Sequence, residues 1–146
     1  MNAVRDFRVA VAARLVAQVA ALDVEDVIVE RNGSLTEQLA ETVAKASAGI
    51  AVTIGPGAGR NIDPEGGALN MEVVYEITLW VLPIYYDGTF PEDALFIPMM
   101  QALHGESIHA ADDKWLPYEA QVMSFRDVPD QDYLAMSFQL RRRLML

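Results

Sequence analysis

The sequence contains no cysteine, and this absence excludes both a disulfide framework and metal sites built on thiolates. No apolar run approaches the roughly 20 residues of a membrane span, so we expect a soluble protein with no membrane partner. Residues 9–22 are apolar enough to resemble the core of a secretion signal. Because Arg14 and Gln18 interrupt the stretch and no convincing cleavage site follows, we expect a structural helix there.

Positive charge is also scarce. The chain has 11 lysines and arginines against 21 acidic residues, which gives a net charge of −10. Proteins that bind the phosphate backbone usually display a basic stripe, so we expect no specific nucleic-acid binding. One cluster, Arg141, Arg142 and Arg143, departs from this balance next to the C-terminus. Identical copies that meet at this patch and a solvated, frayed chain end are both open interpretations.

The residues that are present favour one globular domain over 1–146. A chain of 146 residues has the usual size of a single domain and buries roughly two thirds of the surface of its unfolded form. Apolar residues make up 52% and charged residues 22%, which is typical of a folded chain and not of a disordered one. We find neither an internal repeat nor a linker that divides the domain.

The segment 70–84, NMEVVYEITLWVLPI, is the most informative part of the sequence, because it predicts one strand about twice the typical length. One face of this strand is uniformly apolar: Met71, Val73, Tyr75, Ile77, Leu79 and Val81. The other face mixes Glu72 and Glu76 with Trp80. A mixed face suits a sheet that is partly solvated and partly covered by a helix or by another chain, so Trp80 is a candidate interface residue.

The first element is predicted to be a helix over 3–22 with apolar residues on two sides. One stripe has helical spacing: Val4, Phe7, Val11, Leu15, Val19 and Leu22. Val9 and Val16 lie nearly opposite this stripe. One side is expected to pack on the chain's own sheet, and the other on a second helix or on a neighbouring subunit; the sequence leaves both open.

The remaining elements follow from caps, turns and alternation. They are a strand at 24–30, a helix opened by the capping box Ser34–Glu37 and ended by Gly49, a strand at 50–54, a helix at 91–103, and a closing hairpin of strands 118–126 and 132–143. Pro98 requires the third helix either to kink or to begin near Ile97. The fold class that follows is α+β: a mainly antiparallel sheet with a long central strand and a hairpin, and helices packed on one face.

The segment 55–69, GPGAGRNIDPEGGAL, holds five glycines and two prolines, which predicts a flexible loop without regular structure. It is either a long hairpin tip or a mobile arm that orders against a partner, with Gly57, Gly59 and Arg60 as contact residues. We expect the amides of Gly57 and Gly59 to exchange quickly. A phosphate-binding loop is disfavoured, because neither a Lys-Ser/Thr pair nor a helix follows the glycines.

No pattern in the sequence indicates a reaction. His104 and His109 are five residues apart with Gly105 between them, so they do not share a helical face; His104 is expected to cap a helix. Glu72 and Glu76 lie about 13 Å apart along a strand, too far for a glycosidase pair, and are expected at the surface or beside cations of a neighbouring strand. We therefore expect no catalytic, cofactor or metal site and no enzyme activity.

The order of these elements resembles that of the tail terminator (tail completion) proteins of long-tailed bacteriophages. The resemblance covers most of the chain and includes two short cues, Ala102-Leu103-His104-Gly105 after a helix and Phe138-Gln139-Leu140-Arg141-Arg142 in the last strand. It implies a non-enzymatic virion protein, made in the host cytoplasm, that forms a ring, typically a hexamer, on the head-proximal end of the tail tube. The implied partners are further copies of itself, the tail tube protein and a head–tail connector or neck protein.

Two other functions are compatible with the same sequence. One is a head–tail joining or neck protein of related build, which is also structural. The other is a small α+β enzyme or ligand-binding domain, which is expected to be a monomer with a deep pocket.

Overall fold

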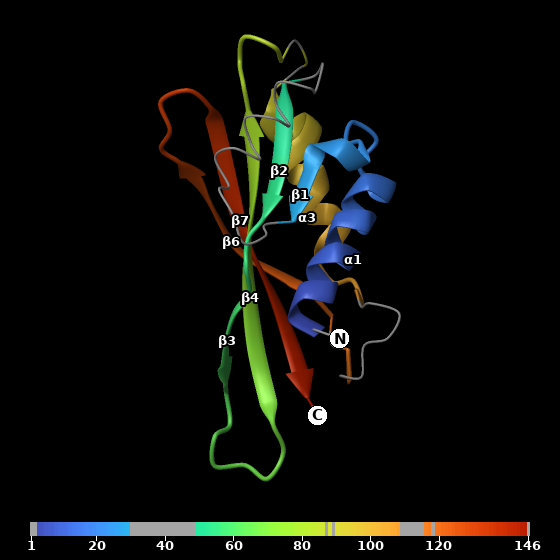
Figure 1. Ribbon diagram of the computed structural model, residues 1–146, viewed down its shortest axis with the longest axis vertical. Helices are drawn as coiled ribbons and strands as arrows, with labels where there is room; N and C mark the ends of the chain where they lie inside the picture. The colour runs from blue at the N-terminus through green and yellow to red at the C-terminus, as the bar shows by residue number, and fades with distance from the viewer. Residues whose placement is uncertain are drawn as a thin grey trace.

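The computed structural model describes residues 3–29, 49–86, 88, 90–108, 116–117 and 119–145 (Figure 1). Their elements are α1 (Ala3–Gln18), the 3₁₀ turn η1 (Val24–Asp26), β1 (Val27–Val29), β2 (Ile50–Ile54), β3 (Ala58–Asn61), β4 (Asn70–Val81), the π-helical turn η2 (Glu92–Phe96), α3 (Ile97–Leu103), β5 (Leu116–Pro117), β6 (Gln121–Val128) and β7 (Leu134–Met145). The predicted capping box at Ser34 and the helix that it opens lie outside the described residues, as does His109.

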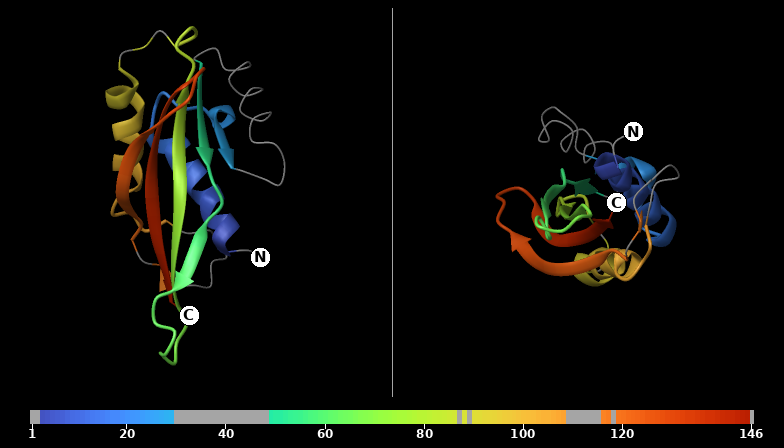
Figure 2. Two further views of the ribbon diagram at one scale, coloured as in Figure 1. Left: turned by 90° about the vertical axis from the view of Figure 1, so that its left-hand side faces the viewer. Right: turned by 90° about the horizontal axis from the view of Figure 1, so that it is seen from below.

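The strands form one mixed sheet in the order β1-β2-β4-β7-β5, with β3 added to β4 and β6 added to β7. Only β1 and β2 are parallel among the described pairs. β4 and β7 pair along their full length, from Asn70 opposite Met145 to Val81 opposite Leu134. Helices α1 and α3 lie on the same face of this sheet (Figures 1 and 2). The predicted α+β class, the long strand and the closing hairpin are confirmed.

The hydrophobic core lies between the helices and the sheet. Alternate residues of β4 point into it, and the predicted apolar face is at most 3% exposed from Val73 to Val81. Helix α1 contributes Phe7, Val11 and Leu15, spaced four residues apart and at most 1% exposed, as the apolar stripe predicts. The helix ends at Gln18, four residues before the predicted end.

Pro98 is accommodated by a change of helix type. Ahead of it, η2 is wound as a π turn in which the Ile97 N–H donates to the carbonyl of Glu92, five residues earlier. A proline has no N–H for the ordinary bond to the residue four before it, and the wide turn takes up that gap. The prediction that Pro98 disturbs this helix is confirmed, and the form it takes is a π turn that leads directly into α3.

The prediction that 55–69 has no regular structure is wrong for Ala58–Asn61, which form β3. This strand pairs with β4, and Gly59 lies opposite Val73. The physical reason is the length of β4: β2 covers its edge only from Ile77 to Val81, so the edge beyond is free to bind a second segment. Backbone pairing on that edge outweighs the low strand propensity of glycine.

Residues 62–69 form the tip of the resulting β3–β4 hairpin. The Ile62 N–H donates to the carbonyl of Asn70 at 2.9 Å, and the Gly66 N–H to that of Asp63 at 3.1 Å. Of the two alternatives for this segment, the structure therefore has the long hairpin, which extends past the helices at one end of the molecule (Figure 1). Fast amide exchange at Gly57, which precedes β3, stays a prediction.

Candidate functional site

The outer face of the sheet, which is the face opposite α1 and α3, carries a row of charged side chains across three strands. Glu72 of β4 lies at its centre, 3.7 Å from Arg60 Nη2 of β3 and 3.7 Å from Arg141 Nη1 of β7. Arg143 lies directly opposite Glu72 in the pairing of β4 with β7. These four residues, here called the basic patch, carry a formal charge of +2, from three arginines and one glutamate, in a chain whose net charge is −10.

The second carboxylate of this face, Glu76, is bound to two side chains. Its Oε1 accepts from Arg126 Nη2 of β6 at 2.9 Å and from the Ser137 hydroxyl of β7 at 2.7 Å. The prediction of a cation on a neighbouring strand is confirmed for Glu72, whose partners come from β3 and β7. The cation that binds Glu76 comes from β6, which pairs with β7 and not with β4. An open cleft of about 480 Å³ with a mixed polar and apolar lining runs between Glu72 and Glu76 beside Gly59. Within the described residues, no group of three potential metal ligands lies here or elsewhere.

The other end of the outer face is apolar. Trp80 packs there with Ala51, Leu82 and Tyr133, and its indole meets the Tyr133 ring edge-on at a centroid distance of 5.9 Å. Its Nε1 donates to the Thr53 hydroxyl at 2.9 Å. Trp80 is thus half-buried with its polar atom bonded inside the chain, and its role as an interface residue stays a prediction.

Arg142 is a correction to the predicted arginine cluster. Its side chain is 0% exposed, because the alternation of β7 points it into the core between Leu140 and Leu144. The guanidinium lies over the Phe7 ring, 4.4 Å from the centroid, and bonds the Tyr75 hydroxyl. Burial raises the pKa of Tyr75 to about 12 and lowers the pKa of Arg142. This residue cannot contact a neighbouring subunit in the folded chain, whereas Arg141 and Arg143 lie on the outer face.

The second side of α1 is only partly covered. Val9 is 53% exposed, and Val16 is half-buried. Among the described residues, none encloses Val9, so contact with a second helix or with a neighbouring subunit stays a prediction for both valines. They lie on the helix side of the molecule, and the basic patch lies on the opposite side of the sheet.

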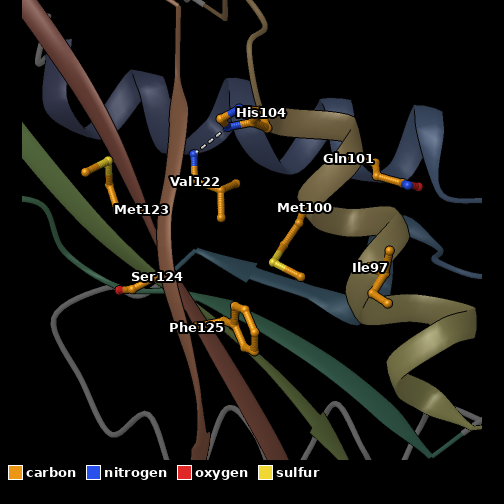
Figure 3. Close-up of a pocket in the computed structure, with 8 residues that line it drawn as sticks. All are labelled: Ile97, Met100, Gln101, His104, Val122, Met123, Ser124 and Phe125. Carbon is orange, nitrogen blue, oxygen red and sulfur yellow. Dashed lines mark hydrogen bonds between the residues drawn. The ribbon is translucent and has the colours of Figure 1, made fainter.

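A groove between α3 and β6 was not predicted from the sequence (Figure 3). It has a volume of about 590 Å³ and a largely apolar lining, in which Ile97, Met123 and Phe125 are 41%, 50% and 71% exposed. The signal in the sequence is the pair of large apolar residues Met123 and Phe125 in a strand. Within the described residues, β6 pairs with β7 alone and is therefore an edge strand, and the groove lies between it and α3.

His104 closes one end of the groove. As the cap residue of α3, it holds its side chain toward β6, where Nδ1 accepts the Val122 N–H at 3.0 Å (Figure 3). The prediction that His104 lies at the C-terminus of this helix is confirmed. The prediction that its side chain caps the helix is wrong, because the imidazole accepts a backbone N–H of β6. His104, Glu72 and Glu76 thus each have a hydrogen-bond or ion-pair partner within the fold.

The comparisons with known proteins concern the fold. No protein-family model and no curated protein matches the sequence. Among the described residues, no helix has the length and hydropathy to cross a membrane. The structure matches one chain of a solved structure titled "Virion of native gene transfer agent (GTA) particle" with a TM-score of 0.59 and 16% identity, over 95% of this chain and 94% of the other. The two chains share one fold over nearly their whole lengths.

Proposed function

We propose that this protein is a structural component of a phage-like virion and acts there as a tail terminator. In this role a ring of identical copies, six by the resemblance, caps the head-proximal end of the tail tube, ends tube polymerisation and gives a head or neck protein its docking surface. The observation that carries the proposal is the shared fold with a chain of a gene transfer agent virion over 95% of the sequence.

The surfaces of a single copy support an assembling role. The α3–β6 groove exposes Ile97, Met123 and Phe125, and Val9 is exposed on α1. Clustered exposed apolar side chains of this size are typical of contact sites between proteins. They lie on different elements, as a ring requires, because each copy in a ring uses two different surfaces to bind its two neighbours.

The chemistry of the described residues supports a structural role over a catalytic one. Glu72 and Glu76 are held in ion pairs, and His104 accepts a backbone bond. Each of these three groups thus has a partner within the fold and a structural role there.

Assembly with tube subunits tests this function. Tail tube protein from the same particle is polymerised with and without an excess of the purified chain, and tube lengths are measured by negative-stain electron microscopy. We expect shorter tubes with additional density at one end only. The test variant is Phe125→Asp, which places a charge in the exposed groove. We expect it to abolish the cap, because the proposal uses this groove as a contact site.

Three results would contradict the proposal. Unchanged tube lengths exclude a terminator. Binding to isolated heads but not to tubes favours a neck protein. A monomer whose melting temperature rises on addition of a metabolite indicates a ligand-binding domain or an enzyme.

A further inference from the structure

We propose that the basic patch of one copy binds the acidic turn between β6 and β7 of a neighbouring copy, so that identical chains join head to tail. This contact rests on the proposed function, because it supplies one of the subunit contacts of a ring. It is carried by the placement of opposite charges at the two ends of the same sheet.

The basic patch is accessible from solvent. The Arg60 side chain is 76% exposed, and Arg143 is exposed on the adjacent row of the sheet. Arg141 is held in place by Glu72 and by a bond to the Gln121 side-chain carbonyl, so it fixes the position of the charge. The acidic residues that follow Arg60 most closely in the sequence lie at the β3–β4 tip, beyond the ends of the strands. The carboxylate of one of them, Asp63, lies over Gly66.

The acidic turn concentrates negative charge at a fixed position. Asp127, Asp130 and Asp132 lie within six residues and are all exposed. Asp130 Oδ1 accepts the N–H groups of Asp132 and Tyr133, at 2.9 and 3.1 Å, which holds the turn in one conformation. No ion pair between described residues involves these three carboxylates. The turn therefore presents a preformed anionic surface.

The two charged sites of one chain cannot neutralise each other. The turn precedes Leu134 at one end of β7 and Arg143 is near the other end, nine residues away, or about 30 Å at the usual rise per residue. This separation is about three Debye lengths at moderate salt. In Figure 1 the turn leans to the side of the sheet away from the helices, which is also the side of β3. Asp130 and Asp132 lie in the turn itself, whereas Asp127, at the end of β6, pairs with Met136 and so lies on the helix side of the sheet. The turn is thus available to a second copy at the end of the sheet, and the basic patch to one that approaches the outer face.

The contact is heterologous, because one copy contributes its patch and the other its turn. Such a contact leaves a free turn and a free patch at the two ends of any open chain of copies. Repetition closes a ring when the rotation between neighbours allows it, as the proposed function requires. Complementary charge also sets the orientation of the approaching copies.

Charge reversal on each side tests the contact. The patch variant is Arg60→Glu with Arg143→Glu, which changes the patch from +2 to −2. The turn variant is Asp127→Lys with Asp132→Lys, which leaves Asp130 to hold the turn. Assembly of the full chain is followed by sedimentation velocity at low and high salt, and Glu25→Lys with Glu119→Lys is the matched control for the turn variant, because both residues are exposed and the net charge changes equally.

We expect each variant alone to assemble at least about tenfold more weakly than the wild type at low salt, because its two sites now carry like charges. An equimolar mixture should regain assembly to within about threefold of the wild type, since the reversed patch of one variant then matches the reversed turn of the other. The control should assemble like the wild type, and high salt should weaken the wild-type assembly.

The outcomes separate this contact from the proposed function. If the wild type assembles and both variants assemble equally well, the contact is wrong and the structural role stands. If the mixture fails while each variant keeps its thermal unfolding midpoint, the pairing of patch with turn is wrong. A patch variant that assembles normally but loses DNA binding assigns the patch to nucleic acid instead. A wild type that stays monomeric at every salt concentration overturns both proposals.

Discussion

The buried arginine of β7 gives the sharpest prediction about the energetics of this fold. Arg142 and Phe7 are both 0% exposed, and the guanidinium lies 4.4 Å from the ring centroid. Cation–π pairs within about 6 Å contribute roughly 0.5–1 kcal/mol at exposed sites and about 2 kcal/mol when desolvated. Because both partners are fully enclosed, we expect the larger value, about 2 kcal/mol.

A double-mutant cycle isolates this interaction from the other changes that each substitution makes. Phe7→Leu also loses the contact with the Tyr75 ring, and Arg142→Met removes a buried charge together with the bond to the Tyr75 hydroxyl. These side effects appear in the single variants and largely cancel in the coupling energy. Unfolding in urea, followed by circular dichroism for the four proteins, measures the free energies.

The control cycle combines Phe7→Leu with Trp80→Phe on the other face of the sheet, where we expect additivity within about 0.5 kcal/mol. For Phe7 and Arg142 we expect a coupling energy above about 1 kcal/mol in favour of the native pair. A coupling no larger than that of the control pair would refute the assignment of Arg142 to the aromatic face of Phe7.

Two further predictions concern stability. Gly49 has a φ of +67°, and a Cβ there would lie 2.6 Å from the Tyr85 Cβ. Gly49→Ala should therefore lower the free energy of unfolding by more than about 1 kcal/mol. The control is Gly67→Ala, where a Cβ meets no atom within 4 Å and the free energy of unfolding should change by less than about 0.5 kcal/mol. Burial raises the pKa of Asp26 above its usual 3.8, so the stability it contributes is present below that value and is lost as pH rises through the folded-state pKa. Asp26→Asn should therefore gain stability relative to the wild type as pH rises above 3.8, and a pH-independent difference in urea unfolding would contradict this.

Alternation along strands accounts for the inward face of β4 and also for the burial of Arg142 in β7. The period-two pattern of 70–84 correctly assigns the inward face of β4, which is buried from Val73 to Val81. The same rule in the last strand places Met136, Phe138 and Leu140 inward, and one more step reaches Arg142. The charge of Arg142 favours a surface position, but alternation along the strand places its side chain on the inward face. There it contacts the face of the Phe7 ring and the Tyr75 hydroxyl.

Features that depend on which strands meet could not be predicted from local sequence. Ala58–Asn61 have the composition of a loop, and they form a strand because β4 offers them a free edge. The α3–β6 groove likewise depends on tertiary contacts, because the closing hairpin places β6 beside η2 and α3, with the centroids of the Phe125 and Phe96 rings 6.4 Å apart. The basic patch joins Arg60 to Arg141 and Arg143, which are 81 and 83 residues later in the sequence, through the register of β3, β4 and β7.

Electron microscopy of the purified wild-type chain tests the central claim, that this fold assembles with copies of itself, most directly. At micromolar concentration and low salt, we predict annular particles in negative stain, with a light-scattering mass of several chains. Uniform small particles with the mass of a single chain, unchanged as concentration rises, would contradict the account.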